Sequence, residues 1–204
     1  MVPLKLYLKY SSNFIPSTFK LHRANPVGIY CLLPNKTAHT YARMIKELKQ
    51  LLPGAHPRKI LVDFEQAPIN AFRAGYPLAD ILGCYFHLKQ SVNRKINDLG
   101  LKEMYESNDD FRLYSRCLSA LAYVPEDDVG NSFDTLAEIF GELNGSSELI
   151  SYFEKTYIRG RRNPRQRNNF AAPLYNVRLW NKHNSTLEGV ARTQHRTYQR
   201  NMKI

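Results

Sequence analysis

The sequence predicts an α/β fold in which strands and helices alternate, followed by a part of the chain that is wholly helical. Two short apolar runs, Ile60-Leu61-Val62 and Ile81-Leu82, each precede a segment whose apolar residues recur at helical spacing. Beyond Gly100 only the helical spacing remains. Alternating strands and helices are typical of a sheet covered by helices. We therefore expect residues 1–100 to form a sheet core, and residues 101–158 to form a helical insertion packed against it.

The elements before residue 60 begin with a short alternation of apolar residues that predicts an edge strand within residues 1–24. A clearer strand follows at residues 27–33, an apolar run bounded by Pro26 and Pro34. Asn35-Lys36-Thr37 then resembles a helix start, and the helix extends to Pro53-Gly54. Its apolar residues at helical spacing are Tyr41, Met44, Ile45 and Leu48.

The two later strands deliver polar residues to their carboxyl ends. Asp63 and Glu65 follow the first strand and open a helix that ends near Ala74, while Cys84 and His87 follow the second and open a helix that stops at Gly100. In open α/β sheets the carboxyl ends of the strands face the functional crevice. These four residues are therefore the candidate site.

The predicted insertion consists of three helices, one ending near Leu121, one beginning at Pro125 and one capped by Ser146. Aromatic residues recur in them at helical spacing within an apolar pattern, so we predict that they form the core rather than stack on bases. These residues are Tyr114, Phe133, Phe140 and Phe153, with Trp180 similar.

The net charge is concentrated at one end of the chain. Residues 1–154 hold 17 basic and 17 acidic residues, whereas residues 155–204 hold 12 basic residues and only Glu188. Five arginines stand close together in a segment that is a loop by composition: Arg159, Arg161, Arg162, Arg165 and Arg167. Such a run favours nucleic acid as a partner, because arginine forks match phosphate oxygens. A solvated basic tail without a specific partner and a nuclear localisation signal are alternative interpretations.

Length and composition exclude several classes. No apolar run approaches the roughly 18 residues that span a bilayer, and the N-terminus lacks the features of a signal peptide. Three scattered cysteines do not make a disulfide framework. We expect an intracellular protein in a reducing compartment, without a membrane or a small-molecule substrate as a partner.

Two motifs carry a family resemblance. Asp63-Phe64-Glu65 and Gly83-Cys84-Tyr85-Phe86-His87-Leu88, with the helix between them, resemble the Mutator-like (MULE) transposase domain, as does the Leu-Leu-Pro-Asn-Lys-Thr segment at residues 32–37. The resemblance implies a ribonuclease H-like mixed sheet flanked by helices, and it extends over roughly residues 25–193. It implies a nuclear protein of DNA transposition and recombination that binds DNA, with other transposase chains as further candidate partners.

The same resemblance implies DNA cutting and joining by two-metal phosphoryl transfer, in which three carboxylates hold two Mg²⁺ or Mn²⁺ ions about 4 Å apart. Asp63 corresponds to the second of these ligands. Residues 1–62 contain no aspartate, so the first ligand is missing and the chain is expected to begin after the family's first strand. No acid follows Glu188, so the final glutamate, expected near Tyr198, is missing too.

Residues 1–100 are accordingly expected to be an incomplete core, and residues 159–204 a basic loop with a remnant of the core's C-terminal part. We expect no metal bound tightly by this chain. Glu65 is interpreted as a residue of the first helical turn that complements the helix dipole. Cys84 and His87 are interpreted as part of the crevice wall or as a means of positioning DNA; half of a zinc site and a buried thiol with a core histidine remain alternatives.

The function that follows is that of a transposase-derived domain, inactive as this chain. The first alternative is a domesticated DNA-binding or protein-interaction module that retains the fold without catalysis. The second is a decaying gene product without a selected role.

Overall fold

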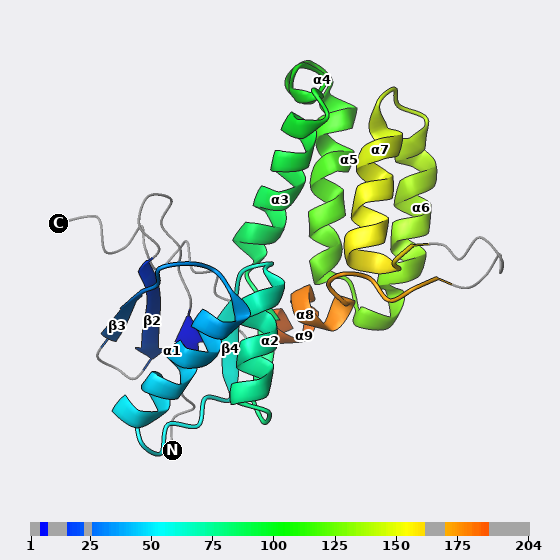
Figure 1. Ribbon diagram of the computed structural model, residues 1–204. Coiled ribbons are helices and arrows are strands. Elements are labelled where there is room, and N and C mark those ends of the chain that lie inside the picture. The colour runs from blue at the N-terminus through cyan, green and yellow to red at the C-terminus, as the bar shows by residue number, and fades with distance from the viewer. Residues whose placement is uncertain (1–4, 8–15, 23–25, 162–169, 188–204) are drawn as a thin grey trace. The chain divides into compact units, whose positions relative to one another are not determined.

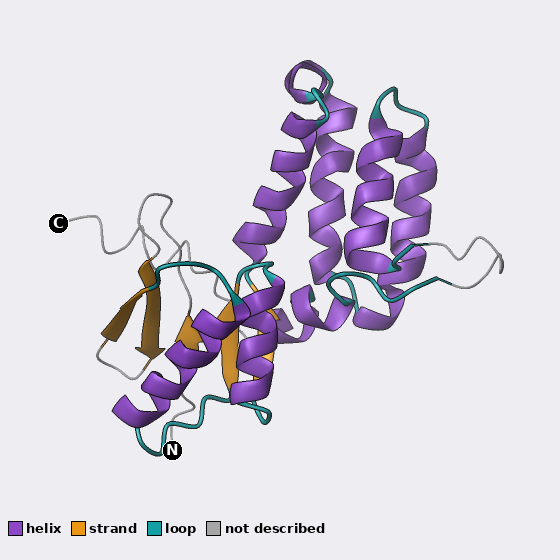
Figure 2. Cartoon of the chain, in the orientation of Figure 1, coloured by secondary structure: helices purple, strands orange, loops and turns teal. Residues whose placement is uncertain are grey.

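The computed structural model describes residues 5–7, 16–22, 26–161 and 170–187. The chain divides into two compact units, Met1–Cys84 and Tyr85–Ile204. The first unit contains all the described strands and two helices, and the described elements of the second are helical (Figures 1 and 2). The mixed α/β architecture predicted from the sequence is therefore confirmed.

The strands of the first unit form a parallel sheet and an antiparallel hairpin. The parallel sheet has the order β1-β4-β5, formed by Lys5–Tyr7, Lys59–Val62 and Asp80–Gly83. The hairpin joins β2 (Pro16–His22) to β3 (Pro26–Leu32). Strand β1 also lies next to β2, so parallel and antiparallel strands are neighbours within this unit.

Strand β1 lies where the sequence predicted an edge strand within residues 1–24. We expected the chain to begin after the family's first strand, which would leave the sheet open at its edge unless residues 1–24 completed it. In the structure β1 pairs in parallel with β4, and Leu6 lies opposite Ile60. The side of β4 that a missing strand would leave open is therefore occupied, which removes an unpaired edge that would invite association.

The two helices of the first unit are α1 (Ala38–Leu51) and α2 (Gln66–Gly75), which lie side by side (Figure 1). The close approach depends on Gly75, because a Cβ atom there would lie 2.6 Å from Cγ2 of Ile45. The residues that α1 buries are the four predicted from its spacing: Tyr41, Met44, Ile45 and Leu48.

The second unit is built around helices that run side by side. Helices α3, α5, α6 and α7 have roughly parallel axes, and α4 lies at one end of them (Figure 1). Two 3₁₀ turns at Leu121–Tyr123 and Glu126–Asp128 precede α6, and a π-helical turn at Glu154–Ile158 follows α7. The helices are α3 Tyr85–Asp98, α4 Lys102–Ser107, α5 Asp109–Ala120, α6 Val129–Gly141, α7 Ser146–Phe153, α8 Val177–Trp180 and α9 His183–Leu187.

Helix α3 contacts α5 and α7, and the two compact units divide after Cys84. The helical insertion expected at residues 101–158 stays a prediction. Pro125 does not start α6 directly. It precedes the 3₁₀ turn, and α6 begins at Val129. None of the described helices is long and apolar enough to cross a membrane.

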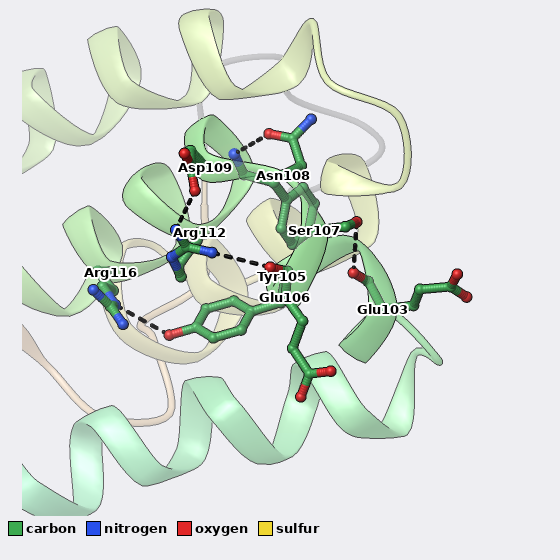
Figure 3. Close-up of polar contacts among 9 residues, drawn as sticks. Glu103, Tyr105, Glu106, Ser107, Asn108, Asp109, Arg112 and Arg116 are labelled. Atoms are coloured by element: carbon green, nitrogen blue, oxygen red, sulfur yellow. Dashed lines mark hydrogen bonds and ion pairs between the residues drawn. The ribbon is translucent and has the colours of Figure 1, made fainter.

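The junction of α4 and α5 is fixed by a cap (Figure 3). Asn108 Oδ1 accepts a hydrogen bond from the backbone N–H of Phe111 at 2.8 Å. Asp109 and Asp110 occupy the first turn of α5, where negative charge complements the helix dipole. Arg112 pairs with Asp109 and donates to the carbonyl of Glu106 at 3.1 Å. These contacts define where α4 ends and α5 begins.

Aromatic side chains fill the interior of the helical unit, as predicted. Phe133, Phe140, Phe153 and Trp180 are buried, and Tyr114 is half-buried against Phe140. Trp180 donates its indole N–H to the carbonyl of Tyr157 at 3.2 Å. A buried indole that finds such a partner adds its large apolar surface without leaving an unpaired polar group.

Tyr157 links α3 to the end of this aromatic core. Its hydroxyl lies 2.7 Å from Ser91 Oγ on α3, and its ring stacks on Tyr175. Burial raises the pKa of Tyr157 well above its usual range, with the neighbouring Tyr152 contributing in the same direction. The hydroxyl therefore stays protonated and keeps its hydrogen bond throughout the physiological pH range.

We predict that Tyr157→Phe makes the alkaline loss of stability shallower. An unfolded tyrosine ionises near pH 10, whereas Tyr157 in the folded chain retains its proton to higher pH. The contribution of Tyr157 to the free energy of unfolding is therefore complete below about pH 10 and declines as the pH rises beyond that value. At neutral pH the loss of the hydrogen bond should cost about 1 kcal/mol. Urea unfolding across this range measures both effects, and a slope equal to that of the wild type would contradict the prediction.

Candidate functional site

The carboxyl ends of β4 and β5 lie side by side and bring two candidate residues to one edge. Val62 is the register partner of Gly83, and the N–H of Cys84 donates to the carbonyl of Val62 at 2.9 Å. Asp63 and Cys84, which follow these strand ends, are 8% and 1% exposed. The structure thus places both residues at the edge where α/β proteins carry their sites.

Phe64 makes the tightest contact at this edge. A Cβ atom on Gly83 would lie 2.6 Å from Cζ of the Phe64 ring, closer than non-bonded atoms approach. The ring therefore rests on the bare backbone of Gly83. The Asp-Phe-Glu and Gly-Cys motifs are in physical contact, and this contact requires glycine at position 83 because any larger residue would displace the ring.

Glu65 stands at the N-cap position of α2, where its side chain makes no capping hydrogen bond. Its carboxylate instead pairs with Lys36 Nζ at 2.7 Å. Both side chains are partly exposed, so the pair is worth about 1 kcal/mol or less. The ion pair matters for the arrangement of the chain, because it joins the segment before α1 to the turn after β4.

That segment is itself held by a network of short polar side chains. Thr37 caps α1 by accepting from the N–H of Thr40 at 3.3 Å. Asn35 Oδ1 in turn accepts from the backbone N–H of Thr37 at 3.2 Å and from its hydroxyl at 2.9 Å. Lys36 is therefore presented by an ordered turn, and three motif segments distant in sequence meet near Asp63.

His87 belongs to the second unit. It occupies the first turn of α3, where it is half-buried and its ring packs edge-on against Phe86, with 5.3 Å between the ring centroids. Cys84 belongs to the first unit and takes part in no disulfide. The buried thiol fits the interpretation of Cys84 as part of the crevice wall and equally that of a core residue.

The described residues do not fit the two-ion arrangement that the motifs imply. Among them there is no group of three or more His, Cys, Asp or Glu side chains that could hold a metal ion. The carboxylate nearest in sequence to Asp63, that of Glu65, is paired with Lys36. A zinc site has no better support, since a closed site takes four ligands.

The first residue of the arginine run has a structural role. Arg159 pairs with Asp134, and its Nε lies 3.2 Å from a carboxylate oxygen of Glu154. Its guanidinium also lies over the rings of Phe133 and Phe170, 5.8 and 5.3 Å from their centroids. Two carboxylates thus neutralise its charge, and these contacts assign Arg159 a role in packing.

The two ends of the arginine loop are held together just beyond Arg159. The N–H of Gly160 donates to the carbonyl of Ala171 at 2.8 Å, and the N–H of Ala171 donates to the carbonyl of Arg161 at 3.0 Å. A Cβ atom on Gly160 would lie 2.3 Å from the carbonyl oxygen of Ala172, so only glycine fits. Arg161 is exposed. The other predicted arginines, Arg162, Arg165 and Arg167, lie outside the described residues.

Sequence reasoning missed the contacts that connect these residues. Lys36 gave no sign of its pairing with Glu65, which lies 29 positions away. The packing role of Arg159 depends on Asp134, another distant residue. The need for glycine at position 83 was open to inference, because a glycine at the end of a buried strand often marks the close approach of another group.

Comparison with known proteins shows a similarity to transposases over part of the chain. Residues 18–91 match the family model of the MULE transposase domain. Over this stretch the resemblance to a Mutator-like transposase domain is confirmed, and it includes Lys36, Asp63, Glu65, Cys84 and His87. The rest of the range over which the sequence resembles the family, beyond residue 91, lies outside the matched stretch. No curated protein matches the chain.

We predict that Gly83→Ala destabilises the chain by about 1–3 kcal/mol, because the added methyl group must push the Phe64 ring away. Gly130→Ala is the matched control. Gly130 lies in α6 with nothing within 4 Å of its added Cβ, so that change should be neutral or stabilising by up to about 1 kcal/mol. Thermal or urea unfolding of both variants measures the difference, and equal stabilities would show that the ring contact is not needed.

Proposed function

We propose that this chain is a transposase-derived DNA-binding domain that does not itself cut or join DNA. A transposase-related function follows from the family match over residues 18–91. The observation that carries the finer proposal is the convergence of three motif segments beside Asp63, through Lys36–Glu65 and Phe64–Gly83. The ancestral scaffold is retained at the point where the ancestral chemistry would have taken place.

A ribonuclease H-like core is part of this proposal. The parallel strands β1, β4 and β5, with the hairpin β2–β3 beside β1, make a mixed set of strands as that fold requires. Helices α1 and α2 then pack together in the same unit. Asp63 follows β4, next to the strand that the first ligand of the family would occupy.

The proposed lack of catalysis follows from the small number of carboxylates that could serve as metal ligands. Two hard dications need several oxygen ligands, and the ancestral Mg²⁺ or Mn²⁺ site would need two acids besides Asp63. No aspartate precedes Asp63, and Glu47, the single acid before it, lies on α1. No acid follows Glu188. The chain retains one of the three ligands that the family resemblance implies.

DNA is the proposed partner because the excess positive charge is available to phosphates. All of the net charge of +11 arises from residues 155–204. Of the five arginines in the run, Arg159 is neutralised by carboxylates. The proposed contacts to the phosphate backbone come from Arg161, Arg162, Arg165 and Arg167, and a nuclear location accords with such a partner.

A domesticated module that keeps the fold without catalysis is the alternative proposal. It binds either DNA or another protein, and other transposase chains are candidates for the latter. The arginine run favours DNA, because arginine matches phosphate oxygens in pairs. The following measurement separates the two partners.

We predict that replacing Arg161, Arg162, Arg165 and Arg167 with alanine weakens DNA binding and flattens its dependence on salt. Each phosphate that an arginine no longer neutralises should reduce the slope of log K against log salt by about 0.9. Fluorescence anisotropy with a labelled duplex over a salt series gives both quantities. Because no base-reading motif is present, the weakening should be similar for duplexes of different sequence.

The matched control removes the same number of charges from the first unit, by alanine at four exposed residues: Arg43, Lys46, Arg58 and Arg73. These changes should leave the salt slope nearly unchanged. Equal weakening in the two variants would mean that only net charge matters. Unchanged binding in the loop variant would place the DNA contacts elsewhere, and no salt-dependent binding in the wild type would favour a protein partner.

We predict that the wild type does not cleave DNA in the presence of Mg²⁺ or Mn²⁺, because a single carboxylate cannot hold two ions. A gel assay of supercoiled plasmid nicking, with Asp63→Ala and the surface variant Asp98→Ala in parallel, tests this. Cleavage that is abolished by Asp63→Ala and retained with Asp98→Ala would mean that further ligands exist and that the chain is an enzyme.

A further inference from the structure

The helical unit contains a polar pocket that the proposed function does not use. It has a volume of about 210 Å³ and lies where α3, α4 and α5 meet. Exposed residues form its solvent side and buried serines its floor. The polar residues that line it are Lys89, Asn93, Tyr105, Ser115, Arg116 and Ser119.

The environment of Ser115 indicates that the pocket binds a ligand. The side chain of Ser115 is 1% exposed, and its hydroxyl makes no hydrogen bond to any described residue. A buried serine on a helix usually bonds a carbonyl of the preceding turn, as Ser119 does with Arg116 at 2.9 Å. Buried polar groups without a partner are rare, and a pocket beside one supplies the place for it.

Two side chains that line the pocket are positively charged. Arg116 is held in place by Tyr105, and Lys89 has no opposing charge among the described residues. Arg116 Nε donates to the hydroxyl of Tyr105 at 3.1 Å, and the guanidinium lies 5.9 Å from the centre of that ring (Figure 3). Its two terminal nitrogens and the proton of the Tyr105 hydroxyl remain available to a ligand. Lys89 forms no ion pair with any described residue.

The lining is therefore rich in donors and carries positive charge. Lys89 and Arg116 contribute two positive charges, and the pocket has no acidic lining residue among those described. Hydroxyl groups and an amide add neutral donors. Charge-assisted hydrogen bonds from such groups are the strongest that an oxyanion can accept in a protein.

We propose that this pocket binds a phosphate group, with Lys89 and Arg116 neutralising its charge and Ser115 donating to one of its oxygens. The group comes either from free phosphate or from the phosphodiester backbone of a nucleic acid. None of the lining residues belongs to the arginine run, so the proposal stands whether or not that run binds DNA.

The test is thermal melting of the full chain over a titration of inorganic phosphate, against sodium chloride at matched ionic strength. Phosphate should raise the melting temperature in a saturable way, as ligand binding to the folded state requires. In Lys89→Ala the phosphate dissociation constant should rise by about tenfold or more. Lys155→Ala removes the same charge from an exposed site outside the pocket and should behave as the wild type.

Ser115→Ala provides a second and independent readout. Without phosphate it should melt at or above the wild-type temperature, because the substitution removes a buried hydroxyl that has no partner among the described residues. With phosphate its shift should be smaller than that of the wild type. A fall in its melting temperature without phosphate would show that the hydroxyl serves the fold rather than a ligand, and would overturn the proposal.

Binding of a labelled duplex by the same variants distinguishes the two sources. If Lys89→Ala weakens duplex binding and phosphate competes with the duplex, the pocket takes a backbone phosphate. If duplex binding is unchanged while the phosphate shift disappears, the ligand is free phosphate. The proposal is overturned if phosphate stabilises the wild type no more than chloride does, or if its effect persists unchanged in Lys89→Ala.

Discussion

The contact of the Phe64 ring with Gly83 is the constraint on which the edge of the sheet depends. The spacing of β4 and β5 is set by their hydrogen bonds, so the ring fits over β5 only where no side chain projects. With the ring in this position, the directions of the two neighbouring side chains are fixed. Asp63 is buried at the strand end, and Glu65 faces Lys36. The Asp-Phe-Glu motif thus has a role in packing.

Positive charge in this chain serves different purposes according to what surrounds it. Arg159 belongs by sequence to the same run as Arg161, yet it lies between two carboxylates and two aromatic rings and stabilises the fold. Arg116 lies near a tyrosine hydroxyl rather than a carboxylate, so its charge stays available. A count of basic residues therefore indicates the kind of partner but does not assign the role of any one residue.

The sequence could predict the elements whose apolar spacing is long and regular. Helix α1 buries the four residues expected from its period, and the aromatic core of the helical unit was recognised in the same way. The hairpin strand β2 was missed because its alternation of apolar and polar residues, Phe19-Lys20-Leu21-His22, is too short to mark a strand clearly. The packing of α3 against α5 and α7 could not be predicted, since periodicity identifies a helix but not the helices against which it packs.

The residues of the candidate site could be predicted from the sequence, but the contacts between them could not. Strand ends followed by Asp63 and Cys84 could be read directly, since parallel strands end at one edge. The pairings that define the roles of Lys36 and Arg159 join positions 25 or more residues apart, and no local pattern encodes them.

The backbone hydrogen bonds at Gly160 and Ala171 make the fold independent of the sequence between them. Because the two ends are joined by backbone hydrogen bonds, the helical core meets the same two anchor points whatever lies between them. Lengthening such a closed segment costs free energy only as the logarithm of its length, about 0.6 kcal/mol for each doubling. Residues 162–169 can therefore change in number and charge over evolutionary time without redesign of the core.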